Sequence, residues 1–134
     1  MAGLICDTSI WIDFFSGKDT DKVKYLVQSI LEDVPIYTCP TIIQELLQGI
    51  RNDDQFGLIK GRMSFFPSLD NQWLNASIGA AQLYRSIRKR GVTIRKPNDC
   101  LIAWYAIEYN LPLLHNNRDF ELIAEFSELR ILEP

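Results

Sequence analysis

Four acidic side chains are the residues of this sequence best suited to joint chemistry: Asp7, Glu45, Asp99 and Asp119. Each has apolar neighbours, so each is expected to be partly removed from water. Carboxylates that converge in such a setting repel one another, and burying their charge is costly. A divalent cation would remove that conflict, and oxygen ligands favour Mg²⁺ or Mn²⁺ over zinc. A cation held by acidic side chains is a usual arrangement for attack of water on a phosphodiester.

The elements that must position these acids alternate along the chain. Strands are predicted over 4–6, 36–39, 65–69, 112–114 and 129–132. Helical periodicity is found around 10–15 and over 21–31, 40–50, 56–63, 74–90, 97–106 and 118–124. Strands separated by helices indicate an α/β fold with a mainly parallel sheet, here one domain over 1–134. Ligands of such sheets bind beyond the carboxyl ends of the strands, which is where all four acids are expected.

Each acid also has a purely structural interpretation. Asp7 would cap the helix that follows it, and Asp119 would cap its own short helix. Asp99 would complement a helix dipole, and Glu45 would extend from a helix edge into solvent. Taken together, four acids near one edge of the sheet favour a metal site over four separate structural roles.

Composition sets the class of protein. The chain has 134 residues, a net charge of −3 and 47% hydrophobic residues, as expected of a globular domain. Its three cysteines have no CxxC spacing, and one histidine makes a zinc site improbable. No segment is predicted to be a signal peptide or a membrane span. We therefore expect a soluble, cytoplasmic protein.

Four segments in order carry a family resemblance: 4–12 (LICDTSIWI), 41–49 (TIIQELLQG), 97–103 (PNDCLIA) and 113–120 (LLHNNRDF). The chain resembles the PIN-domain ribonucleases, most closely the VapC-type toxins of toxin–antitoxin pairs. This resemblance implies a three-layer α/β/α sandwich with a five-stranded, mainly parallel sheet. It also implies a Mg²⁺- or Mn²⁺-dependent endoribonuclease.

The resemblance assigns the metal ligands and catalytic acids to Asp7, Glu45 and Asp99, with Asp119 at a more variable fourth position. Thr8 and Ser9 follow Asp7, and a hydroxyl there would orient a carboxylate or a water molecule. For Ser9, a helix cap is an equally good interpretation.

The segment 113–120 departs from the family pattern at two positions. Asn117 stands where many relatives have another acid, so it and Asn116 would contact metal-bound water without adding charge. His115 stands where a small hydroxyl residue is common. It is expected to be a hydrogen-bonded variant rather than a group that assists proton transfer.

Six cations and no acid lie within residues 85–96: Arg85, Arg88, Lys89, Arg90, Arg95 and Lys96. Because this stretch ends just before Asp99, we expect Arg95, Lys96 and Arg88 to contact RNA phosphates. A solvated helix face is the alternative, above all for Arg85 and Lys89.

The resemblance also implies partners: an RNA substrate, a VapB-type antitoxin and a second copy of the chain. DNA binding is not expected of this chain alone. The early helices supply candidates for the antitoxin contact, with a place in the core as the alternative: Trp11, Phe14, Phe15, Tyr25 and Leu47. Two other functions remain open, a PIN-like binding module without turnover and, less favoured, a phosphatase that uses Asp7 as phospho-acceptor.

Overall fold

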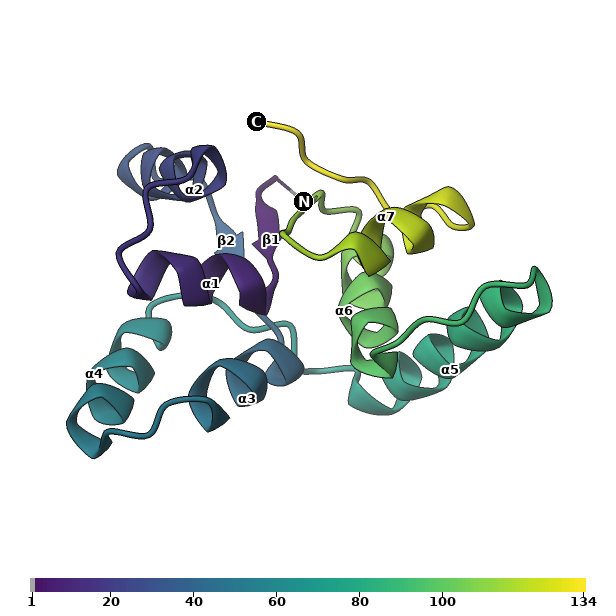
Figure 1. Ribbon diagram of the computed structural model, residues 1–134, viewed down its shortest axis with the longest axis horizontal. Helices are drawn as coiled ribbons and strands as arrows, with labels where there is room; N and C mark the ends of the chain where they lie inside the picture. Colours follow the sequence, from purple (N-terminus) through teal and green to yellow (C-terminus); the bar gives the residue numbers. More distant parts are fainter. Residues whose placement is uncertain (1) are drawn as a thin grey trace.

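Three short parallel strands form the sheet of the computed structural model, which describes residues 2–134 (Figure 1). They are β1 (Leu4–Cys6), β2 (Ile36–Tyr37) and β3 (Leu113–Leu114), in the order β2-β1-β3. Ile5 of the central strand lies opposite Tyr37 on one side and Leu113 on the other. Because all three strands run the same way, the segments that follow them emerge at one edge of the sheet.

The predicted five-stranded sheet is wrong in its strand count. The outer two predicted strands, 65–69 and 129–132, each contribute a single parallel bridge, from Ser68 to Thr38 and from Ile131 to Leu113. Pro67 has no N–H to donate, and the short outer pairing consists of two backbone hydrogen bonds around Thr38. The parallel direction and the α/β class are confirmed.

Helices occupy most of the rest of the chain. They are α1 (Thr8–Phe15), α2 (Asp21–Leu31), α3 (Pro40–Gln48), α4 (Asp53–Met63), α5 (Trp73–Lys89), α6 (Pro97–Glu108) and α7 (Arg118–Glu125). Two of them begin with a proline whose missing N–H costs nothing in a first turn, and these two carry Glu45 and Asp99.

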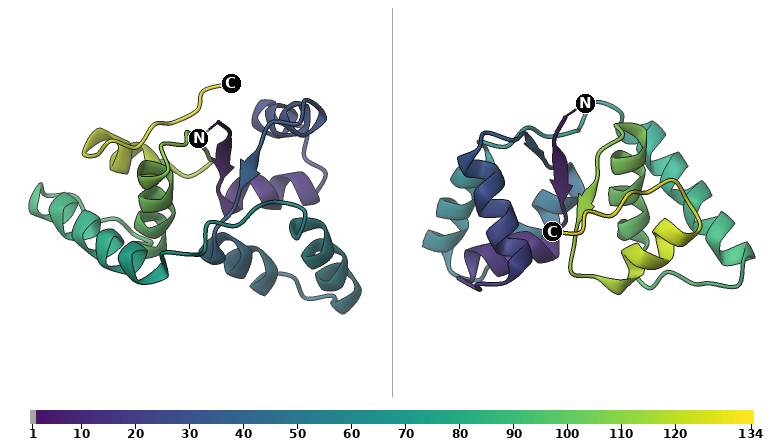
Figure 2. Two further views of the ribbon diagram at one scale, coloured as in Figure 1. Left: turned by 180° about the vertical axis from the view of Figure 1, so that it is seen from behind. Right: turned by 90° about the horizontal axis from the view of Figure 1, so that it is seen from above.

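The sheet lies between helices on both sides. Figure 1 shows α1 and α2 beside one side of β1 and β2, and α6 and α7 beyond the other; Figure 2 shows the same order from behind. β1 is buried along its whole length, and Trp11 of α1 is fully buried beneath Phe66. Trp11 is therefore a core residue and is removed from the candidates for an antitoxin contact.

The helix that carries Asp99 is held by close packing against α5. Gly79 of α5 faces the indole of Trp104 on α6, and a Cβ at Gly79 would overlap that ring. Glycine is needed here because the two helices approach closely, not because of its backbone angles. This contact fixes α6 against α5.

Within residues 2–134, none of the helices is long and apolar enough to cross a membrane.

Candidate active site

Three of the four predicted acids line one cavity of about 350 Å³ at the carboxyl edge of the sheet. Asp7 follows β1, Glu45 lies on α3 and Asp99 lies on α6. The other lining residues are Thr8, Ser9, Ile12, Gln48, Lys96, Asn116 and Asn117. Residues far apart in the sequence thus meet where the parallel strands end.

Asp7 is fixed by its backbone and its neighbour. Its N–H donates to the carbonyl of Leu114 in β3, and its Oδ1 accepts a 2.6 Å hydrogen bond from the Ser9 hydroxyl. Only 4% of Asp7 is exposed, and burial raises its pKa to about 7, against the opposing effect of the Ser9 hydrogen bond. Asp7 does stand at the N-cap position of α1, but its side chain makes no capping hydrogen bond.

Glu45 is less buried and is held by the residue after Asp7. Thr8 Oγ1 donates to Glu45 Oε1 over 2.9 Å, which joins α1 to α3. Gln48, three residues further along α3, also lines the cavity. It was missed at the sequence level, although the i,i+3 spacing from Glu45 places both on one helix face.

Asp99 is 3% exposed and receives its hydrogen bond from Asn117, whose Nδ2 lies 2.9 Å from Asp99 Oδ2. Burial raises the pKa of Asp99 to about 6, although this hydrogen bond lowers it, and the charge of Glu45 raises it further. Each of the three cavity acids therefore accepts a hydrogen bond from a neutral side chain.

Asp119 differs from the other predicted acids because it does not line the cavity. It accepts a hydrogen bond from the backbone N–H of Arg95 at 3.2 Å, and Arg95 Nε lies 3.6 Å from the same oxygen, Oδ2. It is as buried as Asp7, and its charge contributes to the raised pKa of Asp99. A fourth acid inside the cavity was expected and is not found.

The residues between β3 and α7 are placed differently from one another. Asn117 caps α7 by accepting from the N–H of Asp119, and the same side chain donates to Asp99. The side-chain amide of Asn116 donates to Asp13 instead of to a cavity acid. His115 is buried, makes hydrogen bonds and does not line the cavity. Burial lowers the pKa of His115, and the charge of Lys22 lowers it further.

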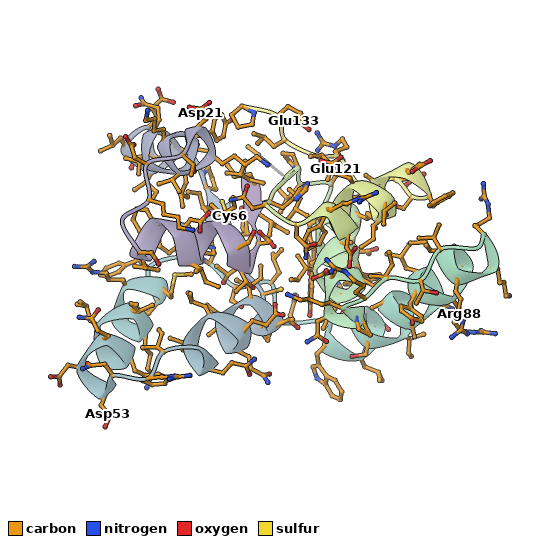
Figure 3. All side chains as sticks on the ribbon, viewed as in Figure 1. Cys6, Asp21, Asp53, Arg88, Glu121 and Glu133 are labelled. Atoms are coloured by element: carbon orange, nitrogen blue, oxygen red, sulfur yellow. The ribbon has the colours of Figure 1, made fainter. Side chains whose placement is uncertain are left out.

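Of the three cations predicted to contact RNA, Lys96 lines the cavity. Arg95 is turned toward Asp119, and the guanidinium of Arg88 lies 5.5 Å from the centre of the Tyr84 ring. Figure 3 shows Arg88 at the outer side of α5, far from the centre of the molecule where Cys6 precedes Asp7.

The donor set fits a hard divalent cation bound partly through water. Among residues 2–134, no three acidic, histidine or cysteine side chains are grouped closely enough to enclose an ion. Mg²⁺ needs no such group, because it keeps several waters and is usually held by one or two carboxylates. Asp7, Glu45 and Asp99 are the residues of the cavity that would hold such a cation.

Comparison with known proteins agrees with this architecture. Residues 4–126 match the PIN domain. The chain belongs to the PIN-domain family. It is 30% identical over 128 residues to VapC ribonuclease Mb1587 of Mycobacterium bovis and, equally, to ribonuclease VapC11 of Mycobacterium tuberculosis; the alignments cover 95% of this chain and 96% of each relative.

Solved structures share the fold of this PIN domain. The DNA-bound VapBC structure from Salmonella typhimurium superposes with a TM-score of 0.76 and 22% identity, covering 98% of both chains. The DNA-bound VapBC2 structure from Rickettsia felis gives a TM-score of 0.75 and 19% identity, covering 96% of both chains. The family match over residues 4–126 and the relatives at 30% identity confirm the family predicted from the four sequence segments.

Proposed function

We propose that this PIN domain is a metal-dependent endoribonuclease and the toxin of a toxin–antitoxin pair. The observation that carries the proposal is the cavity at the sheet edge, where Asp7, Glu45 and Asp99 meet and accept hydrogen bonds from neutral donors only. The curated relatives, which span nearly the whole chain, are named as ribonucleases.

Asp7 and Asp99 would hold a Mg²⁺ or Mn²⁺ ion, with Glu45 completing the site directly or through water. When bound, such a cation neutralises charge on the phosphoryl oxygens and lowers the pKa of a water molecule that attacks phosphorus. Asp119, which the resemblance places at the variable fourth position, would act on this site from behind, through its charge and its contact with Arg95.

The other residues of the cavity would hold the acids in place and bind the RNA. Ser9 and Thr8 each hold one carboxylate oxygen, which leaves the second oxygen of Asp7 and of Glu45 for the cation or its waters. The ammonium of Lys96 would contact a phosphate beside the scissile bond. Hydrolysis would leave a 3′-hydroxyl and a 5′-phosphate.

We also propose the partners that follow from this role. A VapB-type antitoxin would bind the chain, as the names of the VapBC structures indicate for those proteins. A homodimer, a cytoplasmic location and the absence of DNA binding by this chain alone complete the proposal.

One assay separates this function from its alternatives. The purified protein is incubated with a pool of RNA in Mg²⁺, Mn²⁺ or EDTA, and the new ends are mapped. Internal cuts that require a metal are expected. Intact RNA in every metal would point to a binding module, and phosphate release without internal cuts would point to a phosphatase.

Two variants accompany that assay. Asp99→Asn removes a cavity carboxylate and should stop cleavage. Asp53→Asn removes a carboxylate at the outer end of α4, far from the sheet edge in Figure 3, and should leave cleavage unchanged. Equal activity of the two variants would contradict the proposed site.

A further inference from the structure

Two cavity acids depend on the short loop 115–117 between β3 and α7. The N–H of Asn116 donates to Ser9 Oγ over 2.9 Å, and Ser9 in turn donates to Asp7. The side chain of Asn117 donates to Asp99. One loop therefore sets the orientation of a carboxylate that follows β1 and of one that lies on α6.

His115, the first residue of this loop, holds the loop in place through its hydrogen bonds. It is 3% exposed, and its Nδ1 lies 3.0 Å from the backbone nitrogen of Asn117, while its Nε2 lies 3.1 Å from Glu121 Oε1. The carbonyl oxygen of His115 accepts a hydrogen bond from Lys22 Nζ on α2, and its ring packs near Phe120. Both ring nitrogens and the carbonyl are thus occupied.

These contacts define the tautomer. A backbone N–H can only donate, so the Nδ1 atom that receives it carries no hydrogen. The neutral ring then has its hydrogen on Nε2, where it donates to Glu121. Since neither nitrogen faces the cavity, the ring has no free position from which to transfer a proton to a substrate.

We propose that His115 is a positioning residue whose Nδ1 holds the backbone of Asn117, so that the Asn117 amide stays on Asp99 and keeps that carboxylate in its working orientation. This inference rests on the proposed function for its effect on cleavage. The hydrogen bonds that it requires are testable without any activity.

The first test reads the ring directly. His115 is the sole histidine of the chain, so ¹⁵N NMR of the labelled protein reports its two ring nitrogens without ambiguity. We expect a hydrogen on Nε2, no hydrogen on Nδ1, and slow hydrogen exchange at the backbone N–H of Asn117. A hydrogen on Nδ1, or fast hydrogen exchange at the backbone N–H of Asn117, would overturn the inference.

The second test uses two substitutions of opposite geometry. In His115→Asn the amide oxygen takes the place of Nδ1 and still accepts from Asn117. In His115→Gln the amide lies at the position of Nε2 and keeps only the Glu121 contact. We expect the kcat/KM of His115→Asn to stay within about threefold of that of the unsubstituted protein. His115→Gln releases Asn117, the partner of Asp99, and should lose about 10–100-fold in kcat/KM, the usual range when a partner of a metal ligand is lost.

One control variant and one further measurement complete the design. Glu121→Gln keeps an acceptor for Nε2 and should leave cleavage unchanged. Hydrogen exchange at the backbone N–H of Asn117 should be slow in His115→Asn and fast in His115→Gln. If His115→Gln fails to fold, the NMR test on the unsubstituted protein decides the question. Equal cleavage by the two His115 variants would overturn this inference, whereas no cleavage by the unsubstituted protein would overturn the proposed function instead.

Discussion

Asp7 and Asp99 on one side, and Asp119 on the other, are equally buried carboxylates with different surroundings. All three are between 3% and 4% exposed. The first two line the cavity and accept hydrogen bonds from neutral donors, whereas Asp119 lies behind it, next to the guanidinium and the backbone N–H of Arg95. Burial alone therefore does not distinguish a functional acid from a structural one. The difference, within residues 2–134, is that Arg95 pairs directly with Asp119, whereas no basic side chain forms an ion pair with Asp7 or Asp99, although Lys96 lines the cavity and its charge lowers the pKa of Asp99.

The electrostatic consequence appears at the two cavity acids. Burial raises the pKa of Asp7 to about 7 and that of Asp99 to about 6. Without a bound cation, ionised Asp7 and Asp99 are thus costly to the fold. Carboxylates kept at that cost are typical of a site that serves a ligand.

Removal of a cavity carboxylate should have the largest effect. Asp7→Asn or Asp99→Asn is expected to lower the rate of RNA cleavage by at least about 1,000-fold, because residues that act together in one site are rarely dispensable. Circular dichroism should show an intact fold. A variant that keeps a tenth of the activity would remove the distinction drawn here between the two kinds of carboxylate.

The same comparison predicts a pH effect on stability. In EDTA, folding favours protonated Asp7, so its destabilising effect is small at pH 4, close to the ordinary pKa of 3.8, and grows as the pH rises to about 7. Relative to the unsubstituted protein, Asp7→Asn should therefore gain up to about 4 kcal/mol in the free energy of unfolding at pH 8 and almost nothing at pH 4. Urea unfolding at the two pH values measures this gain. A gain that is the same at both would contradict the raised pKa.

Asp119→Asn should behave in the opposite way. It weakens the contacts with Arg95, and because Arg95 is largely exposed, the expected loss is only about 1 kcal/mol of stability at pH 7. Cleavage should fall by less than about tenfold, since Asp119 does not contact the cavity. Urea unfolding and a cleavage assay on one preparation measure both quantities. If activity is lost as completely as in Asp99→Asn, Asp119 belongs with the cavity acids.

The smallest effect is expected from the cations. Lys96→Gln should reduce the slope of log K for single-stranded RNA against log salt concentration by about 0.7, the contribution of one phosphate contact. Arg88→Gln, on the outer side of α5, should change it less. Filter binding of RNA to the Asp99→Asn protein at several salt concentrations measures both slopes. An equal change in both would indicate a diffuse basic surface in place of a contact at the cavity.

The sequence was sufficient for the meeting of Asp7 and Glu45, because each follows a parallel strand and the ends of such strands converge whatever their exact lengths are. Asp99 lies on α6, which follows a helix, so its place in the cavity was predicted from the family resemblance and from its position in a first helical turn. The sequence was not sufficient for Asp119. The side chain of that residue is oriented by the backbone of Arg95, 24 residues earlier, and such a contact leaves no local pattern.

The limits were similar for the sheet and for His115. The residues around Ser68 and Ile131 have the composition of strands, but their pairing stops after one bridge, which depends on how the neighbouring segments pack. The histidine was correctly expected to be hydrogen-bonded. Its partners could not be named, because Lys22 lies 93 residues away and Asn117 contributes a backbone N–H.

The most direct test of the central claim is a Mn²⁺ titration, followed by electron paramagnetic resonance, of the unsubstituted protein, Asp99→Asn and Asp119→Asn. If the cavity carboxylates form the metal site, the Asp119→Asn protein should bind Mn²⁺ nearly as tightly as the unsubstituted protein, and Asp99→Asn should bind at least about tenfold more weakly. Equal affinities of Asp99→Asn and the unsubstituted protein would contradict a metal site in this cavity.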